Sequence, residues 1–413
     1  MDIKVIVGSS YGDCGKGLAT SYFSDNNTLN VLYNGGPQRG HTVELLDGTR
    51  HVFHHFGSGT FKGADTYFDE DFLVNPADFV REYNELKSLG YNPKVFISPE
   101  CRVITLYDIM INQIIEKARG NDRNGSCGMG IWETIDRYNK TIIKDRFGVL
   151  VNGIFDDDQE EIDRNLLCFV ESCREYVTER FEGIEDSWES NALTDEYAAL
   201  TGGVIPPEYQ ELLDNEDLVS HYLNDFEEMK KIVTIVDDYK ELFKNYNNIV
   251  FEGAQGLRLS EDNTVEAWHT TASLTGSKIP MERIKDLNYD SCEVVYITRS
   301  YITRHGAGNL EGECDKSEIN PDIIDKTNEP NDYQGSIRYA KMNLGKLIHY
   351  ITDDEKKSGI FNNPKVNKSI FITHLNYTNN MIGQFTVEEF KKEHSFYKVY
   401  CSDNKYGANK VLN

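Results

Sequence analysis

Short apolar runs alternate along this chain with longer segments in which apolar residues recur every three to four positions. The runs that predict buried strands are Ile3–Val7, Leu29–Tyr33, Val95–Ser98, Asn248–Phe251, Glu293–Thr298 and Ser369–Thr373. Helical spacing predicts helices that include Leu18–Phe23, Thr105–Lys117 and Arg338–Tyr350. Strands that alternate with helices indicate an α/β fold with a large, mostly parallel central sheet.

The stretch from about residue 156 to 245 has a different pattern. It is acidic, has the 3.6-residue period of amphipathic helices and shows almost no strand signal before Asn248. We interpret it as a helical insertion on the sheet, with a solvated face or a dimer surface as its simplest role. No repeat and no linker rich in Pro, Gly or Ser marks a boundary, so we expect a single domain over residues 1–413.

Composition narrows the function classes. The 413 residues carry 43 Lys and Arg against 68 Asp and Glu, a net charge of -25, which argues against nucleic acid or an anionic membrane as partner. The chain starts directly in a strand-like run and has no stretch of eighteen apolar residues, so we expect neither secretion nor membrane spanning. The eight cysteines form no C-x-x-C pair, which favours reduced thiols in the cytoplasm over zinc or disulfides.

A glycine-rich loop, Gly8-Ser-Ser-Tyr-Gly-Asp-Cys-Gly-Lys-Gly17, follows the first predicted strand and precedes a helix. Backbone N–H groups at such a helix start, together with Lys16, suit phosphate oxygens. The loop resembles a P-loop but is not a strict one, since Ser10 replaces the leading glycine and Gly17 replaces the magnesium-binding Ser or Thr. Asp13 is then the candidate Mg²⁺ ligand. The alternative is a plain turn.

Three further glycine-rich turns follow predicted strands. Residues 33–43 contain Gln38, Arg39 and His41, residues 251–256 contain Gln255, and residues 302–308 read Ile-Thr-Arg-His-Gly-Ala-Gly. His41 is a candidate general acid, with a solvated surface histidine as the alternative. Because open α/β sheets bind ligands at the carboxyl ends of their strands, four such turns predict one ligand crevice.

These turns also carry a resemblance. Gly12-Asp-Cys-Gly-Lys-Gly17, Gly35-Gly-Pro-Gln-Arg-Gly-His-Thr42, Phe251-Glu-Gly-Ala-Gln-Gly256 and Thr303-Arg-His-Gly-Ala-Gly308 are similar, in order and approximate spacing, to the hallmark stretches of the adenylosuccinate synthetase family. The resemblance covers nearly the full chain. It implies a ligase that uses ATP or GTP to phosphorylate O6 of a 6-oxopurine nucleotide. In a second step, the amino group of aspartate replaces that phosphate.

The resemblance also implies roles for individual residues. Asp13 would remove the N1 proton of the base and bind Mg²⁺, and Gly40 would offer its carbonyl to the same ion. His41 would act as the acid in phosphoryl transfer, Lys16 would supply a cation, and Gln255 would contact the base. The residues matched to the donor nucleotide are Gly12, Gly15, Lys16, Gly17, Gly40, Thr42, His374 and Asn376. Those matched to the acceptor nucleotide are Asp13, Gln38, Arg39, Ser126, Cys127, Arg146, Gln255, Thr270 and Gly306.

Two departures from the family pattern bear on the nucleotides. Where the family has T-K-L-D, whose aspartate reads guanine, this chain has Thr373-His-Leu-Asn376. An asparagine offers one donor and one acceptor, which complements the adenine edge and favours ATP or dATP, unless Asn376 is an ordinary turn residue. Ser336 replaces the first arginine of the family's aspartate loop, which fits a 2'-deoxy acceptor.

The remaining aspartate-loop residues are Gln334, Gly335 and Arg338, and Arg338 would clamp the carboxylate of the amino acid unless it is a helix-surface arginine. The family's phosphate loop appears as Ser126-Cys-Gly-Met-Gly-Ile-Trp132 without its arginine. The family also uses an arginine from a dimer partner. Arg146 matches it best, with Lys144 as the alternative, so a homodimer is implied.

Together these changes resemble a viral branch of the family, the 2-aminoadenylosuccinate synthases, which act on dGMP and aspartate with an adenine nucleotide. That branch commonly has a smaller residue at position 13, whereas this chain keeps Asp13. The sequence therefore favours dGMP as acceptor and leaves IMP as the alternative, with host cytoplasm as the location if the source is viral. A P-loop kinase and a non-catalytic nucleotide-binding protein are the rivals from other classes.

Overall fold

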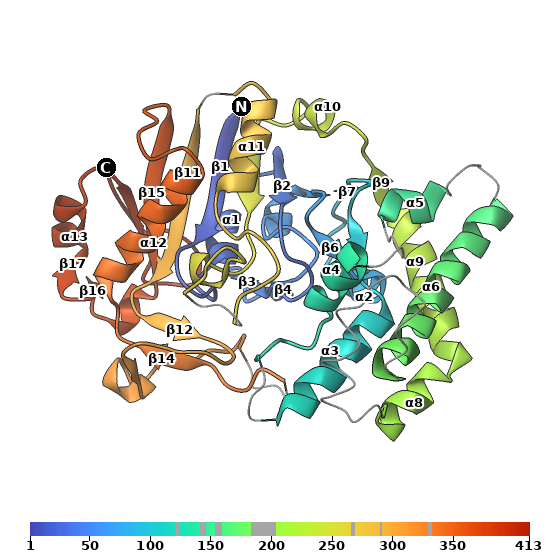
Figure 1. The fold of residues 1–413 in the computed structure, drawn as a ribbon. Coiled ribbons are helices and arrows are strands. Elements are labelled where there is room, and N and C mark those ends of the chain that lie inside the picture. Colours follow the sequence, from blue (N-terminus) through green and yellow to red (C-terminus); the bar gives the residue numbers. More distant parts are fainter. Residues whose placement is uncertain are drawn as a thin grey trace.

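A large twisted sheet forms the centre of the computed structural model (Figure 1), which describes residues 1–120, 124–140, 146–152, 159–182, 204–265, 269–289, 291–328 and 333–413. Its ten strands lie in the order β19-β18-β15-β11-β1-β10-β2-β5-β7-β9, and all pairs are parallel except β18 with β19. In chain order they are β1 (Asp2–Gly8), β2 (Thr28–Leu32), β5 (Asp65–Phe68), β7 (Val95–Ile97), β9 (Val233–Ile235), β10 (Asn248–Glu252), β11 (Cys292–Arg299), β15 (Val366–Thr373), β18 (Lys398–Cys401) and β19 (Lys410–Leu412).

The predicted α/β fold with a mostly parallel sheet is confirmed, and each of the six predicted strands is present. β1 lies between β10 and β11, so Val5 pairs with both Phe251 and Val294. These central strands are buried on both faces, which is why they read in the sequence as continuous apolar runs.

The helices flank this sheet. They are α1 (Lys16–Phe23), α2 (Pro76–Ser88), α3 (Leu106–Arg119), α4 (Ile131–Lys140), α5 (Phe147–Asn152), α6 (Gln159–Glu182), α8 (Pro207–Leu213), α9 (Glu216–Ile232), α10 (Tyr239–Phe243), α11 (Lys278–Asp286), α12 (Leu344–Lys357) and α13 (Val387–Glu393). α3 begins one residue after the predicted start because Thr105 caps it, accepting from the N–H of Asp108 while the Asp108 carboxylate accepts from Thr105.

The predicted helix over Arg338–Tyr350 is wrong in its first turn. Arg338–Ala340 forms strand β14, which pairs antiparallel with β12 (Ile302–Arg304) and β13 (Glu313–Cys314). The helix begins only at Leu344, after Asn343 caps it by accepting from the N–H of Lys346. Arg338 is therefore a strand residue beside a turn, and the alternative of a helix-surface arginine is wrong.

The acidic stretch is helical where the structure describes it, in α6, α8, α9 and α10. Figure 1 shows α6, α8 and α9 at the end of the molecule near β9, and α9 packs on α2. One prediction is wrong here, since Val233–Ile235 forms β9 and extends the sheet by pairing with β7. Three partly exposed residues at a sheet edge are too short a run to give a strand signal.

The remaining strands form small sheets: the β3 (His41–Glu44) and β4 (Arg50–Phe53) hairpin, β6 (Leu73–Val74) with β8 (Arg102–Val103), and β16 (Met381–Ile382) with β17 (Phe385–Thr386). All eight cysteines are free thiols, as expected. Among the helices of the described residues, none is both long and apolar enough to cross a membrane.

Candidate active site

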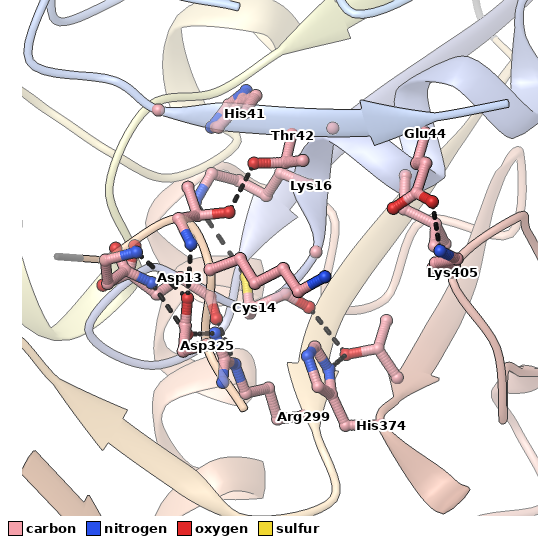
Figure 2. A pocket seen from close by; sticks show the side chains of 18 of the residues that line it. Asp13, Cys14, Lys16, His41, Thr42, Glu44, Arg299, Asp325, His374 and Lys405 are labelled. Atoms are coloured by element: carbon pink, nitrogen blue, oxygen red, sulfur yellow. Dashed lines mark hydrogen bonds and ion pairs between the residues drawn. The ribbon is translucent and has the colours of Figure 1, made fainter. Parts of the chain in front are cut away.

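A cavity of about 590 Å³, here called the main cavity, opens where β1, β10, β11 and β15 end. Parallel strands bring their carboxyl ends to one edge of a sheet, which is where α/β folds bind ligands. Figure 2 shows Asp13, Lys16, His41, Arg299 and His374 around this space. All predicted donor and catalytic residues line it, namely Gly12, Asp13, Gly15, Lys16, Gly17, Gly40, His41, Thr42, Gln255, His374 and Asn376, together with the predicted acceptor residues Gln38 and Arg39.

The first glycine loop turns tightly from β1 into α1. Gly15, the residue before α1, has φ 94°, and no side chain caps the helix start. A Cβ at Gly15 would come within 2.9 Å of Thr373 Cγ2, so only glycine lets the loop lie against β15. Lys16 is buried at the first helical position. Uncapped N–H groups beside a buried lysine form a site suited to phosphate.

His41, Arg39 and Glu252 form a buried charged group behind the loop. His41 Nδ1 lies 2.6 Å and Arg39 Nη2 lies 2.8 Å from Glu252 Oε1, and the Ser58 N–H donates to Oε2 at 2.9 Å. Burial and the Arg39 charge lower the pKa of His41 to about 3. Burial alone would raise the pKa of Glu252, but Arg39, His41 and Ser58 together lower it to about 2. A neutral His41 therefore donates from Nδ1 to an ionised Glu252, which leaves Nε2 as an acceptor.

Three residues that line the cavity have left-handed backbones although none is glycine: Asp13 with φ 47°, Gln255 with φ 59° and His374 with φ 61°. Each costs about 1 kcal/mol or more relative to an ordinary conformation and persists only where the surroundings hold it. Such strain gathers at functional sites.

A segment over residues 324–328, here called the cover segment, borders the cavity. Asp325 accepts from Arg299 Nη2 at 2.9 Å, and Arg299 Nε donates to the carbonyl of Asp13. Burial opposes ionisation of both partners, yet their mutual attraction lowers the pKa of Asp325 and, with Tyr301, raises that of Arg299. At the other side, Thr327 Oγ1 lies 2.6 Å from Thr42 Oγ1. The cover segment thus joins the β3–β4 hairpin to the end of β11.

The far end of the cavity holds the residues that depart from the family pattern. Asn376 and Tyr377 line it together with Asn404, Lys405 and Tyr406 from the turn between β18 and β19. Lys405 pairs with Glu44 of β3 across the opening (Figure 2).

The other predicted acceptor and aspartate residues do not line the main cavity. Most of them lie in a second group, the acceptor-side loops, defined as residues 124–130, 269–270, 305–308 and 333–336, whereas Arg146 and Arg338 lie outside these ranges. These loops touch closely: a Cβ at Gly125 would come within 2.4 Å of the Ala307 nitrogen, and His269 Nδ1 lies 3.2 Å from the Asn124 carbonyl. His305 Nε2 lies 2.9 Å from the Gly335 carbonyl. Ser126, Cys127, Thr270, Gly306, Gln334, Gly335 and Ser336 all belong to this group.

In the acceptor-side loops, the groups that the sequence predicts to bind phosphate already have partners within the chain. The carboxylate of Glu116 accepts from the N–H groups of Gly125 at 2.9 Å and Ser126 at 3.3 Å, and the Ser126 hydroxyl bonds to Asn112. Burial raises the pKa of the Cys127 thiol to about 11, which keeps it neutral. Ser126 can hold a phosphate only after these bonds rearrange.

Arg338 and Arg146 are likewise engaged. Arg338 donates to the carbonyls of Gly306 and Gly308 and pairs with Glu313 at 2.8 Å, so a carboxylate ligand of Arg338 would have to displace Glu313. Arg146 is exposed, pairs with Glu100 at 2.9 Å and donates to Tyr138. Its role across a dimer interface stays a prediction, and Lys144 lies outside the described residues.

The oxygen atoms available at the main cavity fit magnesium held mainly by phosphates. Asp13 and Gly40 both line the cavity, whereas no cluster of three or more His, Cys, Asp or Glu side chains suited to a metal exists among the described residues. Mg²⁺ needs only one or two protein oxygens when substrate phosphates and water complete its six ligands.

Sequence reasoning missed Glu252, Arg299 and Asp325. Glu252 stands inside the quoted Phe251–Gly256 stretch, at a strand end where charged residues are rarely structural, so its signal was available. Arg299 also ends a strand. Asp325 carries no local signal, because its importance arises from contacts with residues far away in the sequence.

Known proteins of similar sequence belong to one family. The family model described as adenylosuccinate synthetase matches residues 5–376. The adenylosuccinate synthetase of Tolumonas auensis is 28% identical over 315 residues, covering 75% of this chain and 64% of the relative. That of Syntrophobacter fumaroxidans is 27% identical over 337 residues, covering 79% and 66%. The chain thus spans just under two thirds of the length of these curated relatives.

Two solved structures share the fold. The fully ligated adenylosuccinate synthetase of Plasmodium falciparum superposes with a TM-score of 0.60 at 18% identity, covering 91% of this chain and 78% of the other. The succinoaminodeoxyadenylate synthetase of cyanophage S-2L, solved with dGMP and with dATP as energy donor, gives 0.62 at 15% identity, covering 100% and 95%. Since the family model matches most of the chain, the protein belongs to the adenylosuccinate synthetase family.

Proposed function

We propose that the protein is an ATP- or dATP-dependent carbon–nitrogen ligase that joins L-aspartate to dGMP and forms N6-succino-2-amino-2'-deoxyadenylate. The observation that carries the proposal is the main cavity itself. It brings a carboxylate, a buried lysine and a histidine, Asp13, Lys16 and His41, together with the amide of Gln255. A binding protein has no need for all four.

The chemistry has two steps. Asp13 takes the N1 proton of the purine, O6 attacks the γ-phosphorus of the donor, and the nucleoside diphosphate leaves. The aspartate amine then adds at C6, loses a proton, and inorganic phosphate departs from C6. Catalysis of this kind depends on positioning and on charge stabilisation around the transferring phosphoryl group.

Residues of the chain supply this positioning and charge stabilisation. Lys16 faces the phosphates at the start of α1, and bound Mg²⁺, held by Asp13 and the Gly40 carbonyl, would supply further positive charge. His41 is neutral in the free protein, because its pKa is about 3. It can donate from Nε2 only after the phosphates raise that pKa, while Glu252 holds Nδ1.

Three features support the choice of nucleotides. Asn376 lies at the far end of the cavity, in the place of the family's guanine-reading aspartate, and its amide suits adenine. Ser336 leaves no long cation beside the acceptor sugar. The cyanophage S-2L enzyme, which was solved with dGMP and with dATP as energy donor, shares the fold over the whole chain.

A second candidate is an adenylosuccinate synthetase that acts on IMP. This chain keeps Asp13, whereas the branch that acts on dGMP commonly has a smaller residue at this position. The curated relatives carry that name. In either case the partners are small molecules: a purine nucleoside monophosphate, a nucleoside triphosphate and L-aspartate. A homodimer with Arg146 at the interface belongs to the same proposal.

The test is a substrate matrix. Purified protein with Mg²⁺ and aspartate is incubated with IMP, GMP or dGMP against ATP, dATP or GTP, and products are identified by mass. A succino adduct of dGMP formed with an adenine donor supports the proposal, and an adduct of IMP alone supports the second candidate. A nucleoside diphosphate that accumulates over many turnovers without aspartate indicates a kinase. The absence of any product from a protein that binds nucleotides, both as wild type and as Asp13→Ala, indicates a binding protein.

A further inference from the structure

His374 holds a fixed position at the end of β15. Its left-handed backbone is secured by a hydrogen bond from the Ser300 hydroxyl to its carbonyl at 3.0 Å. Its ring lies nearly parallel to that of Tyr377, with centroids 6.2 Å apart, and meets the Tyr301 ring edge-on at 5.9 Å. The side chain lines the main cavity beside Arg299 (Figure 2). The ring therefore presents one definite edge to a ligand.

The neighbouring hydroxyl decides which ring nitrogen carries the proton. Thr373 Oγ1 lies 2.9 Å from the carbonyl of Cys14 and 3.3 Å from that of Thr298, and a carbonyl can only accept. The single proton of Thr373 is thus directed to a carbonyl. Thr373 Oγ1 also lies 2.8 Å from His374 Nδ1, so Nδ1 must be the donor in that bond.

The ring is neutral, so its second nitrogen has a lone pair. Burial, and then the charge of Arg299, lower the pKa of His374 well below its usual value. With the proton on Nδ1, Nε2 is an acceptor. Among the described residues, the bond to Thr373 is the one hydrogen bond that the ring makes, so no residue there donates to Nε2.

We propose that His374 is a specificity residue for the phosphoryl-donor nucleotide, whose Nε2 accepts a hydrogen bond from an N–H or O–H group of that nucleotide. The proposal rests on the proposed function, which places the donor in this part of the cavity. The family motif has lysine at this position, which can only donate. A neutral Nε2 can only accept, so a ligand group that also only accepts, such as a 6-oxo oxygen, is disfavoured beside it.

Two groups of an adenine nucleotide supply such a donor: the 6-amino group and a sugar hydroxyl. Asn376, two residues further on, lines the same end of the cavity and favours the 6-amino group. Separate analogues remove each group: purine riboside triphosphate lacks the amine, dATP lacks the 2'-hydroxyl, and 3'-deoxy-ATP lacks the 3'-hydroxyl.

The experiment measures Kd by calorimetry for ATP and these analogues, with Mg²⁺, in the wild type and two variants. His374→Asn keeps an N–H for Thr373 and tolerates a left-handed backbone, but has no atom at the Nε2 position. His374→Gln places an amide oxygen there. His349→Asn, at an exposed helix position, is the control.

We expect one analogue to bind about tenfold more weakly than ATP to the wild type and to His349→Asn. For His374→Asn the ratio of the two Kd values should fall to about one, and His374→Gln should restore part of it. Because the ratio is taken within each variant, a general loss of affinity leaves it interpretable. Weaker binding of purine riboside triphosphate assigns the hydrogen bond to the base, and weaker binding of a deoxy analogue assigns it to the sugar.

An equal ratio in the wild type and His374→Asn for every analogue overturns the inference. Binding is measured without turnover, so the two proposals fail separately. A protein that discriminates through His374 but makes no succino product contradicts the proposed function alone. A protein that makes the product with unchanged ratios contradicts only the role of His374.

Discussion

In the main cavity the amide atoms of Gln38 and two nitrogens of Arg39 are buried and have no hydrogen-bond partner among the described residues. In the acceptor-side loops and at the neighbouring Arg338, by contrast, comparable groups are satisfied by carboxylates of the chain. Glu116 accepts from the loop N–H groups, and Glu313 pairs with Arg338. A buried polar group without a partner costs about 1–3 kcal/mol, which a ligand can recover. The main cavity thus leaves polar groups for a ligand to satisfy, whereas an anion that binds at the acceptor-side loops or at Arg338 must first displace a carboxylate of the chain.

The largest effect on activity should come from Asp13→Asn, which replaces a carboxylate of the main cavity with an amide of the same size. Asparagine tolerates the φ of 47°, so the backbone should not change. We expect the rate of succino-nucleotide formation, followed by mass, to fall about 10³-fold, because a positioned base contributes about 10²–10⁴-fold. Donor affinity measured by calorimetry is the control. A rate within threefold of wild type would remove Asp13 from the chemistry.

Glu252→Gln should give the largest loss of stability. It leaves Arg39 buried without a counter-charge, and breaking such a pair costs about 3–5 kcal/mol in the free energy of unfolding. The matched change is Glu313→Gln, which removes the partner of Arg338. It breaks a half-exposed ion pair that contributes about 1 kcal/mol or less to the free energy of unfolding. Urea unfolding of both variants tests the contrast, and equal losses would show that the two regions do not differ in this way.

Lowering the pH should destabilise the folded protein through His41 of the main cavity. Its pKa is about 3 in the folded protein against an ordinary 6.5, so below pH 6.5 the unfolded state binds a proton that the folded state does not. Stability from this group is therefore lost as the pH falls from 6.5 towards 3. Between pH 7 and pH 5 the wild type should lose about 2 kcal/mol more than His41→Asn, measured by urea unfolding. Parallel pH curves would show that His41 is not held neutral.

The smallest effect should appear in the kinetics of Glu313→Gln. Arg338 loses its internal competitor, so KM for aspartate should fall by about two- to fivefold while kcat stays unchanged. Initial rates at varied aspartate concentration measure this. A higher KM would mean that Glu313 orients Arg338 for the substrate instead of competing with it.

Most of the sheet could be predicted because its central strands are buried on both faces, and long apolar runs survive in any context. β9 could not, since three half-exposed residues become a strand only through pairing with β7. Arg338–Ala340 looked helical for a related reason: its pairing with β12 depends on residues far away in the sequence.

The site shows the same limit. Glycine turns after strands predicted which residues meet at the main cavity, because parallel topology brings strand ends together. The internal partners Glu116, Glu313 and Asp325 were not predictable, since each acts on a loop that only the folded chain brings within reach.

The place of β1 between β10 and β11 has a consequence for the making of the protein. The glycine loop emerges early in synthesis, yet Ile3 pairs with Ile249 and Lys4 with Glu293. Pairings over such separations form late, because closing a long loop costs entropy before any contact stabilises it. A nascent chain that ends before Arg299 lacks a complete frame for Asp13 and Lys16, so the main cavity should form only after residue 299 has been synthesised.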